Sequence, residues 1–210
     1  MTKIPRALVL IALVIVCVSA QEPKPSVSDT EFQKVLVAVS NEDWDTSLAL
    51  SAKYLKQMEA DDERLPRLRY IYLYSAAGKV SAGRMKYDEL EPLVKGFVSK
   101  EMALPFRPIT LNCRGAFNFI CPSDDSNTKF MVAASTKAAT TILAFEYVQL
   151  KAPFDFASHE DEAASVVGNV DAIVPNPNKS RVLILRLYIT KATIELKEPR
   201  TQISINRFNF

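Results

Sequence analysis

The spacing of apolar residues changes near Leu104-Pro105, and this change constrains the fold more than any other feature of the chain. Before it, apolar residues recur every three or four positions, as Phe32, Val35 and Val39 do, which is the spacing of one buried helix face. After it, short stretches alternate between apolar and polar residues, as strands do. A helical half followed by a strand-rich half predicts an α+β fold.

Residues 29–103 are predicted to form four helices arranged as antiparallel hairpins. Ser28 followed by Glu31 makes a capping box at the start of the first helix. A second capping box, Asp88 with Glu91, starts the last helix, which we expect to continue to about residue 102. The proline-stiffened stretch 103–108 is then a short linker between the two halves.

Two motifs in this half resemble the tetratricopeptide repeat, in which small residues let neighbouring helices approach closely. The match covers about residues 29–102 and implies a helical stack that binds proteins. It departs from the family because Ser81 replaces an aromatic residue, and because Trp44 and Tyr87 lie farther apart than the usual period of about 34 residues. A plain helical bundle is the alternative. The motifs are Tyr74-x-x-Ala77-Gly78-x-x-Ser81 with Tyr87-x-x-Leu90, and Asp43-Trp44-Asp45 with Ser47-Leu48.

Residues 104–210 are predicted to form roughly five or six antiparallel strands in a small barrel or sandwich. The stretch 181–196 is apolar on both faces in its first half, so we expect a central strand there. With the preceding hairpin that carries Gly168, it resembles the end of an oligonucleotide/oligosaccharide-binding (OB) barrel. The terminal Phe208-Asn209-Phe210 resembles the signal of outer-membrane barrels, but a strand or strap packed on the β domain is the preferred interpretation.

Residues 1–20 are typical of a cleaved secretory signal peptide, and residues 21–28 of an extended leader. Lys3 and Arg6 precede an apolar run, 7–18, that is shorter than the roughly 20 residues of a membrane helix. We therefore expect an exported protein without a membrane span after cleavage, periplasmic if the source is bacterial and secreted otherwise.

Charge balance argues against a nucleic-acid partner. The signal carries two of the 26 basic residues, so the remaining chain balances its 24 acidic residues. A neutral chain has no bulk attraction for nucleic acid or for an anionic bilayer.

Two cysteines remain after the signal, Cys113 and Cys121. An even pair in an exported chain favours a disulfide, because the compartment is oxidising. Two buried thiols in adjacent strands are the alternative.

Signatures of catalysis are sparse. The single histidine, His159, is flanked by Ser158 and Asp161, but groups adjacent in sequence rarely form a catalytic triad, and an acidic surface loop is the simpler interpretation. One histidine and two disulfide-prone cysteines are too few for a zinc site, and five glycines leave no phosphate-binding loop. We expect no cofactor and no metal; a hydrolase is a remote alternative.

Arg64, Arg67 and Tyr72 mark a candidate partner surface on the third helix, since a tyrosine beside arginines is typical of interface hot spots. We therefore predict a non-catalytic protein-binding or scaffold component of the cell envelope, whose partner is another envelope or exported protein. The alternative is an OB-like module for a small ligand or oligosaccharide. A groove near Arg67 and Tyr72 would favour the first function, and an aromatic patch on the barrel the second.

Overall fold

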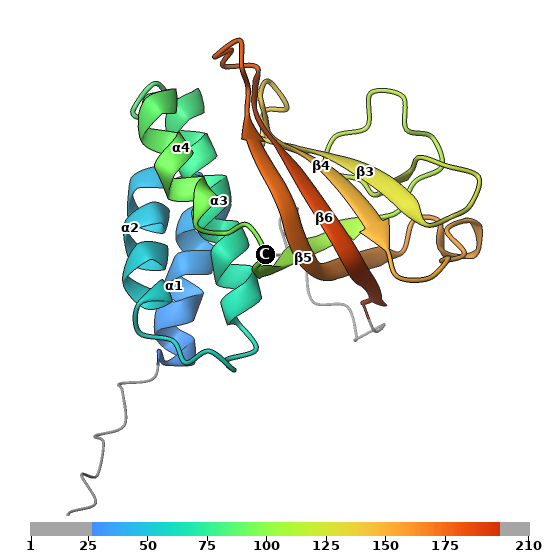
Figure 1. Ribbon diagram of the computed structural model, residues 1–210, viewed down its shortest axis with the longest axis horizontal. Coiled ribbons are helices and arrows are strands. Elements are labelled where there is room, and N and C mark those ends of the chain that lie inside the picture. Colours follow the sequence, from blue (N-terminus) through green and yellow to red (C-terminus); the bar gives the residue numbers. More distant parts are fainter. Residues whose placement is uncertain (1–26, 198–210) are drawn as a thin grey trace, which may run out of the picture.

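The computed structural model describes residues 27–197 and has an α+β fold, with four α-helices followed by a strongly curled six-stranded sheet (Figure 1). The predicted fold class is confirmed. The signal peptide 1–20, most of the leader 21–28 and the C-terminal strap ending in Phe208-Asn209-Phe210 lie outside the described residues.

Consecutive helices pack on one another and form a layer beside the sheet. The predicted capping box of the first helix is present, because the backbone N–H of Glu31 donates to Ser28 Oγ and that of Ser28 donates to the Glu31 carboxylate. Asp43 caps the second helix by accepting from the N–H of Thr46. The helices are α1 (Asp29–Ser40), α2 (Trp44–Leu55), α3 (Leu65–Ser81) and α4 (Tyr87–Lys95).

Helix α3 occupies the centre of the molecule, and 11 of its 17 residues are buried. It contacts α2 and α4 on one side and strands of the sheet on the other. Gly78 permits close packing against α2, since a Cβ atom at this position would lie 2.4 Å from the Trp44 ring. A helix with this many buried residues must be covered on most of its sides, so α3 joins the two halves.

The end of the helical half differs from the prediction. Helix α4 stops at Lys95, and its start is capped by Glu89, whose carboxylate accepts from the Lys86 N–H, rather than by Asp88 with Glu91. The stretch expected to be a linker is a strand, Glu101–Pro108. Prolines are tolerated there because the strand lies at the edge of the sheet, where a missing N–H leaves no ladder partner unsatisfied.

The strand order is β1-β5-β6-β4-β3-β2, which places β6 in the interior of the sheet, as its double-faced apolar pattern predicted. Neighbouring strands are antiparallel except β4 and β6, which are parallel, so the sheet is mixed rather than antiparallel throughout. The β5–β6 hairpin separates β1 from β4, and this insertion produces the parallel pair. The strands are β1 (Glu101–Pro108), β2 (Cys121–Pro122), β3 (Lys129–Ser135), β4 (Ile142–Leu150), β5 (Ala163–Pro175) and β6 (Leu183–Leu196).

The sheet curls until its two edges meet at one end. Just after β1, the N–H of Thr110 donates to the Ile120 carbonyl at 3.0 Å, and the N–H of Ile120 donates back to the Pro108 carbonyl at 2.9 Å. The stretches 109–111 and 116–120 meet in an isolated bridge between Ile109 and Ile120. Helix α3 packs against β1, β4 and β6 and covers the side that the curl leaves open.

Candidate functional site

A buried polar cluster lies between α3 and the sheet. Arg107 of β1 forms a salt bridge with Glu146 of β4, with Nη1 2.5 Å from Oε2. The hydroxyl of Tyr70 on α3 donates to Glu146 Oε1 at 2.6 Å and accepts from Arg107 Nη2 at 2.7 Å. One turn later, Tyr74 donates to the Ser135 carbonyl at 2.7 Å. The cluster thus links the central helix to strands β1, β3 and β4.

Electrostatics keep this cluster in one protonation state. Burial raises the pKa of the Tyr70 phenol well above its usual value, so it remains a hydrogen-bond donor. Burial opposes the charge of Arg107, but the adjacent Glu146 carboxylate more than offsets it, and the pKa of Arg107 is raised. All three side chains are at most 6% exposed. A cluster sealed from solvent in this way stabilises the packing of the two halves and offers no surface to a ligand.

Arg64 and Tyr72, two of the predicted binding residues, make contacts within the protein. The Arg64 guanidinium donates to the carboxylates of Asp62 and Asp29 and to the Val27 carbonyl, at 2.7, 2.8 and 2.9 Å. Hydrogen bonding to Asp62 raises the pKa of Arg64. The Tyr72 ring packs edge-on against Phe97, with centroids 5.4 Å apart.

Arg67 is half-buried on the same helix, and the structure does not gather it with Arg64 and Tyr72 into a shared contact. A broad surface hollow lies elsewhere in the helical layer.

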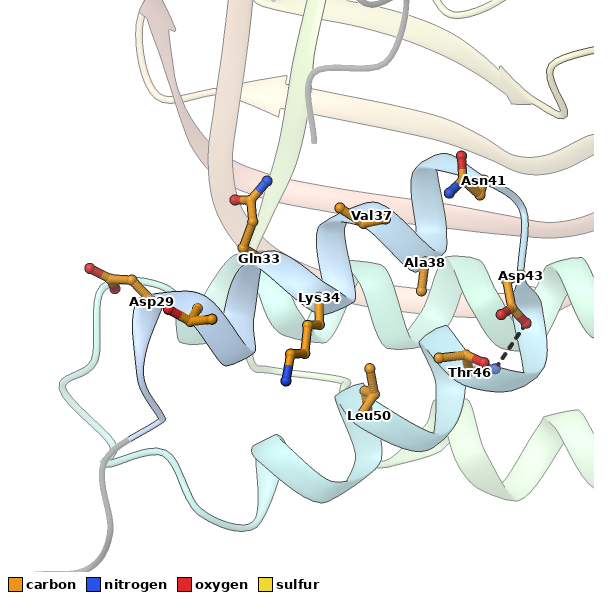
Figure 2. Close-up of a pocket in the computed structure, with 10 residues that line it drawn as sticks. Asp29, Gln33, Lys34, Val37, Ala38, Asn41, Asp43, Thr46 and Leu50 are labelled. Carbon is orange, nitrogen blue, oxygen red and sulfur yellow. Dashed lines mark hydrogen bonds between the residues drawn. The ribbon is translucent and has the colours of Figure 1, made fainter.

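That hollow is a groove of about 840 Å³ along α1 and α2 (Figure 2). Figure 2 shows Lys34 of α1 and Leu50 of α2 pointing toward the space between the two helices. Val37, on the outer side of α1, is 51% exposed, although it is a large apolar residue. The residues lining the groove are Asp29, Thr30, Gln33, Lys34, Val37, Ala38, Asn41, Asp43, Thr46 and Leu50.

The groove has an apolar centre and a polar rim. Val37, Ala38 and Leu50 supply the apolar surface, while Asp29 stands at one end and Asp43 at the other. A groove between two helices with this arrangement fits the apolar face of an amphipathic helix.

A second candidate surface is a row of half-buried aromatic rings on the outward face of the sheet. Tyr147 of β4 stacks on Tyr188 of β6, with centroids 4.8 Å apart and planes 7° apart, and Phe145 lies 5.0 Å from Tyr147. Within residues 27–197, the hydroxyls of Tyr147 and Tyr188 make no hydrogen bond to the protein. They remain available to solvent or to a ligand.

Two hollows, each of about 250 Å³, flank this aromatic row. One is polar at its rim, where Lys129, Gln149 and Asp171 surround the two tyrosines. The other is apolar and lies under the loop that carries Phe117. The residues lining the apolar hollow are Cys113, Gly115, Ala116, Phe117, Cys121, Met131, Ala133, Ile142 and Phe145.

The residues around the single histidine do not converge on one another. Ser158 Oγ donates to Asp155 at 2.6 Å, whereas His159 Nδ1 lies 3.2 Å from Glu162. The His159 ring also stacks on Phe154, with centroids 5.1 Å apart. The hydrogen bonds from Ser158 lower the pKa of Asp155. The predicted acidic loop is therefore a set of local contacts, and Ser158, His159 and Asp161 form no triad.

Cys113 and Cys121 lie beside each other with free thiols, Cys113 exposed and Cys121 buried. Burial, to which the neighbouring Cys113 thiol adds, raises the pKa of the Cys121 thiol to about 12. Their joining as a disulfide stays a prediction.

Across residues 27–197 no group of three or more histidine, cysteine or acidic residues is placed to hold a metal ion. The same residues include no helix that is long and apolar enough to cross a membrane.

Sequence reasoning did not identify the α1–α2 groove or the aromatic row, although each has a signal. Val37 is out of phase with the buried positions Val35 and Val39, which places it on the exposed side of α1, beside the groove. Phe145 and Tyr147 alternate with buried residues of β4, which places both rings on the outward face.

Comparison with protein-family models, with curated proteins and with solved structures gave no match for this chain.

Proposed function

We propose that this protein is an exported, non-catalytic binding component of the cell envelope, and that its α1–α2 groove holds an amphipathic helix of another exported protein. The observation that carries the proposal is the groove itself, about 840 Å³ in volume, with exposed Val37 at its edge. The resemblance of the helical half to tetratricopeptide repeats supports the same class of partner.

The way helix α1 divides its residues between the core and the surface also supports this proposal. Helix α1 buries Phe32, Val35 and Val39 against the core and needs no further partner for stability. Apolar surface that remains exposed after folding favours an interaction site. Export rests on the predicted signal peptide, so the mature chain is expected to begin at Gln21, which N-terminal sequencing of native material would check.

Site-specific photocrosslinking tests the groove. A photoreactive amino acid placed at Val37 is expected to crosslink one partner from native envelope material, and peptide mapping should locate the crosslink on an amphipathic helix. The matched control is the same amino acid at Val182, which is 64% exposed but lies far along the chain in the β half. Equal capture at both positions, or none at Val37, would contradict the proposal.

Substitution provides an independent measurement. Val37→Lys should abolish capture of the identified partner, because a charge replaces apolar contact area, whereas Val182→Lys should retain it. Both valines are exposed, so neither change removes core packing.

A second candidate function is binding of a small ligand that combines hydroxyl groups with an apolar face, such as a sugar. The tyrosine pair with Lys129, Gln149 and Asp171 at its rim favours this function. Because Tyr147 and Tyr188 stack on each other, at most one face of each ring is free for a ligand. Titration of soluble oligosaccharides against Tyr188→Ala and wild type, followed by tyrosine fluorescence, would separate this candidate from the first.

A further inference from the structure

The two cysteines differ in accessibility although they lie side by side. Cys113 is in the loop that follows β1 and is exposed, and its thiol lies 3.6 Å from the Thr110 carbonyl. Cys121 is 7% exposed and belongs to β2, where it pairs with Met131 of β3. Both cysteines line the same hollow of about 250 Å³. One thiol can therefore be reached from solvent, and the other can be reached only through the first.

We propose that Cys113 and Cys121 form a thiol–disulfide exchange site with fixed roles, in which Cys113 attacks an incoming disulfide and Cys121 then closes the 113–121 loop. This inference is independent of the proposed partner groove.

The chemistry balances with a disulfide-bearing small molecule as the oxidant. The Cys113 thiolate attacks one sulfur of the oxidant, whose S–S bond breaks and releases one thiolate. The Cys121 thiolate then attacks the Cys113 sulfur and expels the second thiolate. The two protein thiols lose two protons and two electrons, and the oxidant leaves as two thiols.

Geometry assigns the order of attack. In thiol–disulfide exchange, the attacking sulfur and the two sulfurs of the disulfide lie in one line. Cys113 is exposed and leaves room for this approach, whereas buried Cys121 does not. The pairing of Cys121 with Met131 fixes that residue in the strand ladder, whereas Cys113 is on a loop and can turn outward.

The same arrangement makes both closure and reduction slow. A reductant can attack only the exposed Cys113 sulfur, so Cys121 has to leave as a thiolate. Burial raises the pKa of Cys121 to about 12, which makes its thiolate a slow leaving group and also makes its attack on Cys113 the slow step of closure.

Closure would act on the apolar hollow of the sheet. The loop between the two cysteines carries Phe117, and the hollow beneath it is lined by both cysteines and by Met131 and Phe145. Joining the sulfurs fixes this loop at both ends, so the wall of the hollow is held in place.

The test uses the full mature chain, reduced and then exposed to oxidised glutathione, with intact-mass measurement. Wild type should lose two hydrogen atoms and retain no glutathione. Cys121→Ser should retain one glutathionyl group on Cys113, because nothing displaces it. In Cys113→Ser, glutathionylation of Cys121 should be about ten-fold or more slower than glutathionylation of Cys113 in Cys121→Ser, so the variant should remain mostly unmodified over the same period.

A time course on wild type removes any dependence on how the variants fold. Alkylation of the reduced protein, followed by peptide mapping, should label Cys113 before Cys121. Equal rates at the two cysteines, faster modification of Cys121, or stable glutathione on wild type without ring closure would each overturn the assigned roles.

Discussion

Helices α1 and α3 both pack on α2, yet they are buried to very different extents. Helix α3 buries 11 of its 17 residues, whereas α1 buries 4 of its 12. The difference follows from position, because α3 packs against α2, α4 and three strands of the sheet, whereas α1 packs mainly on α2. The comparison indicates that α3 determines how the halves fit together, whereas much of the surface of α1 remains exposed.

The strongest test of this comparison removes the Glu146 charge, which is buried between α3 and the sheet. Glu146→Gln leaves Arg107 buried without its counter-ion, and breaking a buried pair costs about 3–5 kcal/mol. The free energy of unfolding from urea titration should fall by that amount.

The triple variant Tyr70→Phe, Arg107→Met and Glu146→Leu is the control, since it removes both charges together with the hydroxyl that they hold and should recover most of the loss. A loss below about 1 kcal/mol for Glu146→Gln would mean that the pair does not hold the halves together.

A second test probes how closely α3 packs on α2. Gly78→Ala should destabilise the protein by about 1–3 kcal/mol, because the added Cβ would lie 2.4 Å from the Trp44 ring. Gly96→Ala is the matched control, since nothing lies within 4 Å of a Cβ atom added there. Thermal unfolding of both variants measures the difference, and equal melting temperatures would show that the packing relaxes around the methyl group.

A smaller loss is expected at the start of α1. Ser28→Ala removes the cap that accepts from the Glu31 N–H and should lower the free energy of unfolding by about 1 kcal/mol. Ser28→Asp keeps an acceptor at the same position and should stay close to wild type. If the two variants are equally destabilised, the loss comes from something other than the missing cap.

The smallest expected change in stability is at Val37, on the exposed side of α1. Val37→Lys should alter the free energy of unfolding by no more than about 0.5 kcal/mol, because the side chain is already 51% exposed. The same substitution is expected to abolish partner capture. A large loss of stability would show that Val37 belongs to the core and would weaken the interpretation of the groove.

Sequence patterns predicted those elements whose ends or burial are determined by residues close together in the chain. The capping box of Ser28 and Glu31 located the start of α1, and the double-faced apolar run located β6 in the interior of the sheet. Strand β1 was missed because Pro105 suggested a linker, and only the position of the strand at the sheet edge makes that proline acceptable.

Contacts between distant residues could not be predicted in the same way. Tyr70, Arg107 and Glu146 lie on three separate elements, and no local pattern pairs them. Arg64 was predicted to face a partner, but it is held by Asp62, two residues earlier in the chain. Such a pairing depends on how the loop before α3 folds back, which periodicity does not report.

The strand order has a consequence for the time at which this chain can fold. The β5–β6 hairpin is the last part of the described chain to be synthesised, yet it lies between β1 and β4 in the finished sheet. Until residues 163–196 have left the ribosome, β1 has no partner strand and β4 lacks one of its two neighbours. Long-range pairing of this kind is slow. A nascent chain would therefore stay largely unfolded in its second half until β5 and β6 are complete.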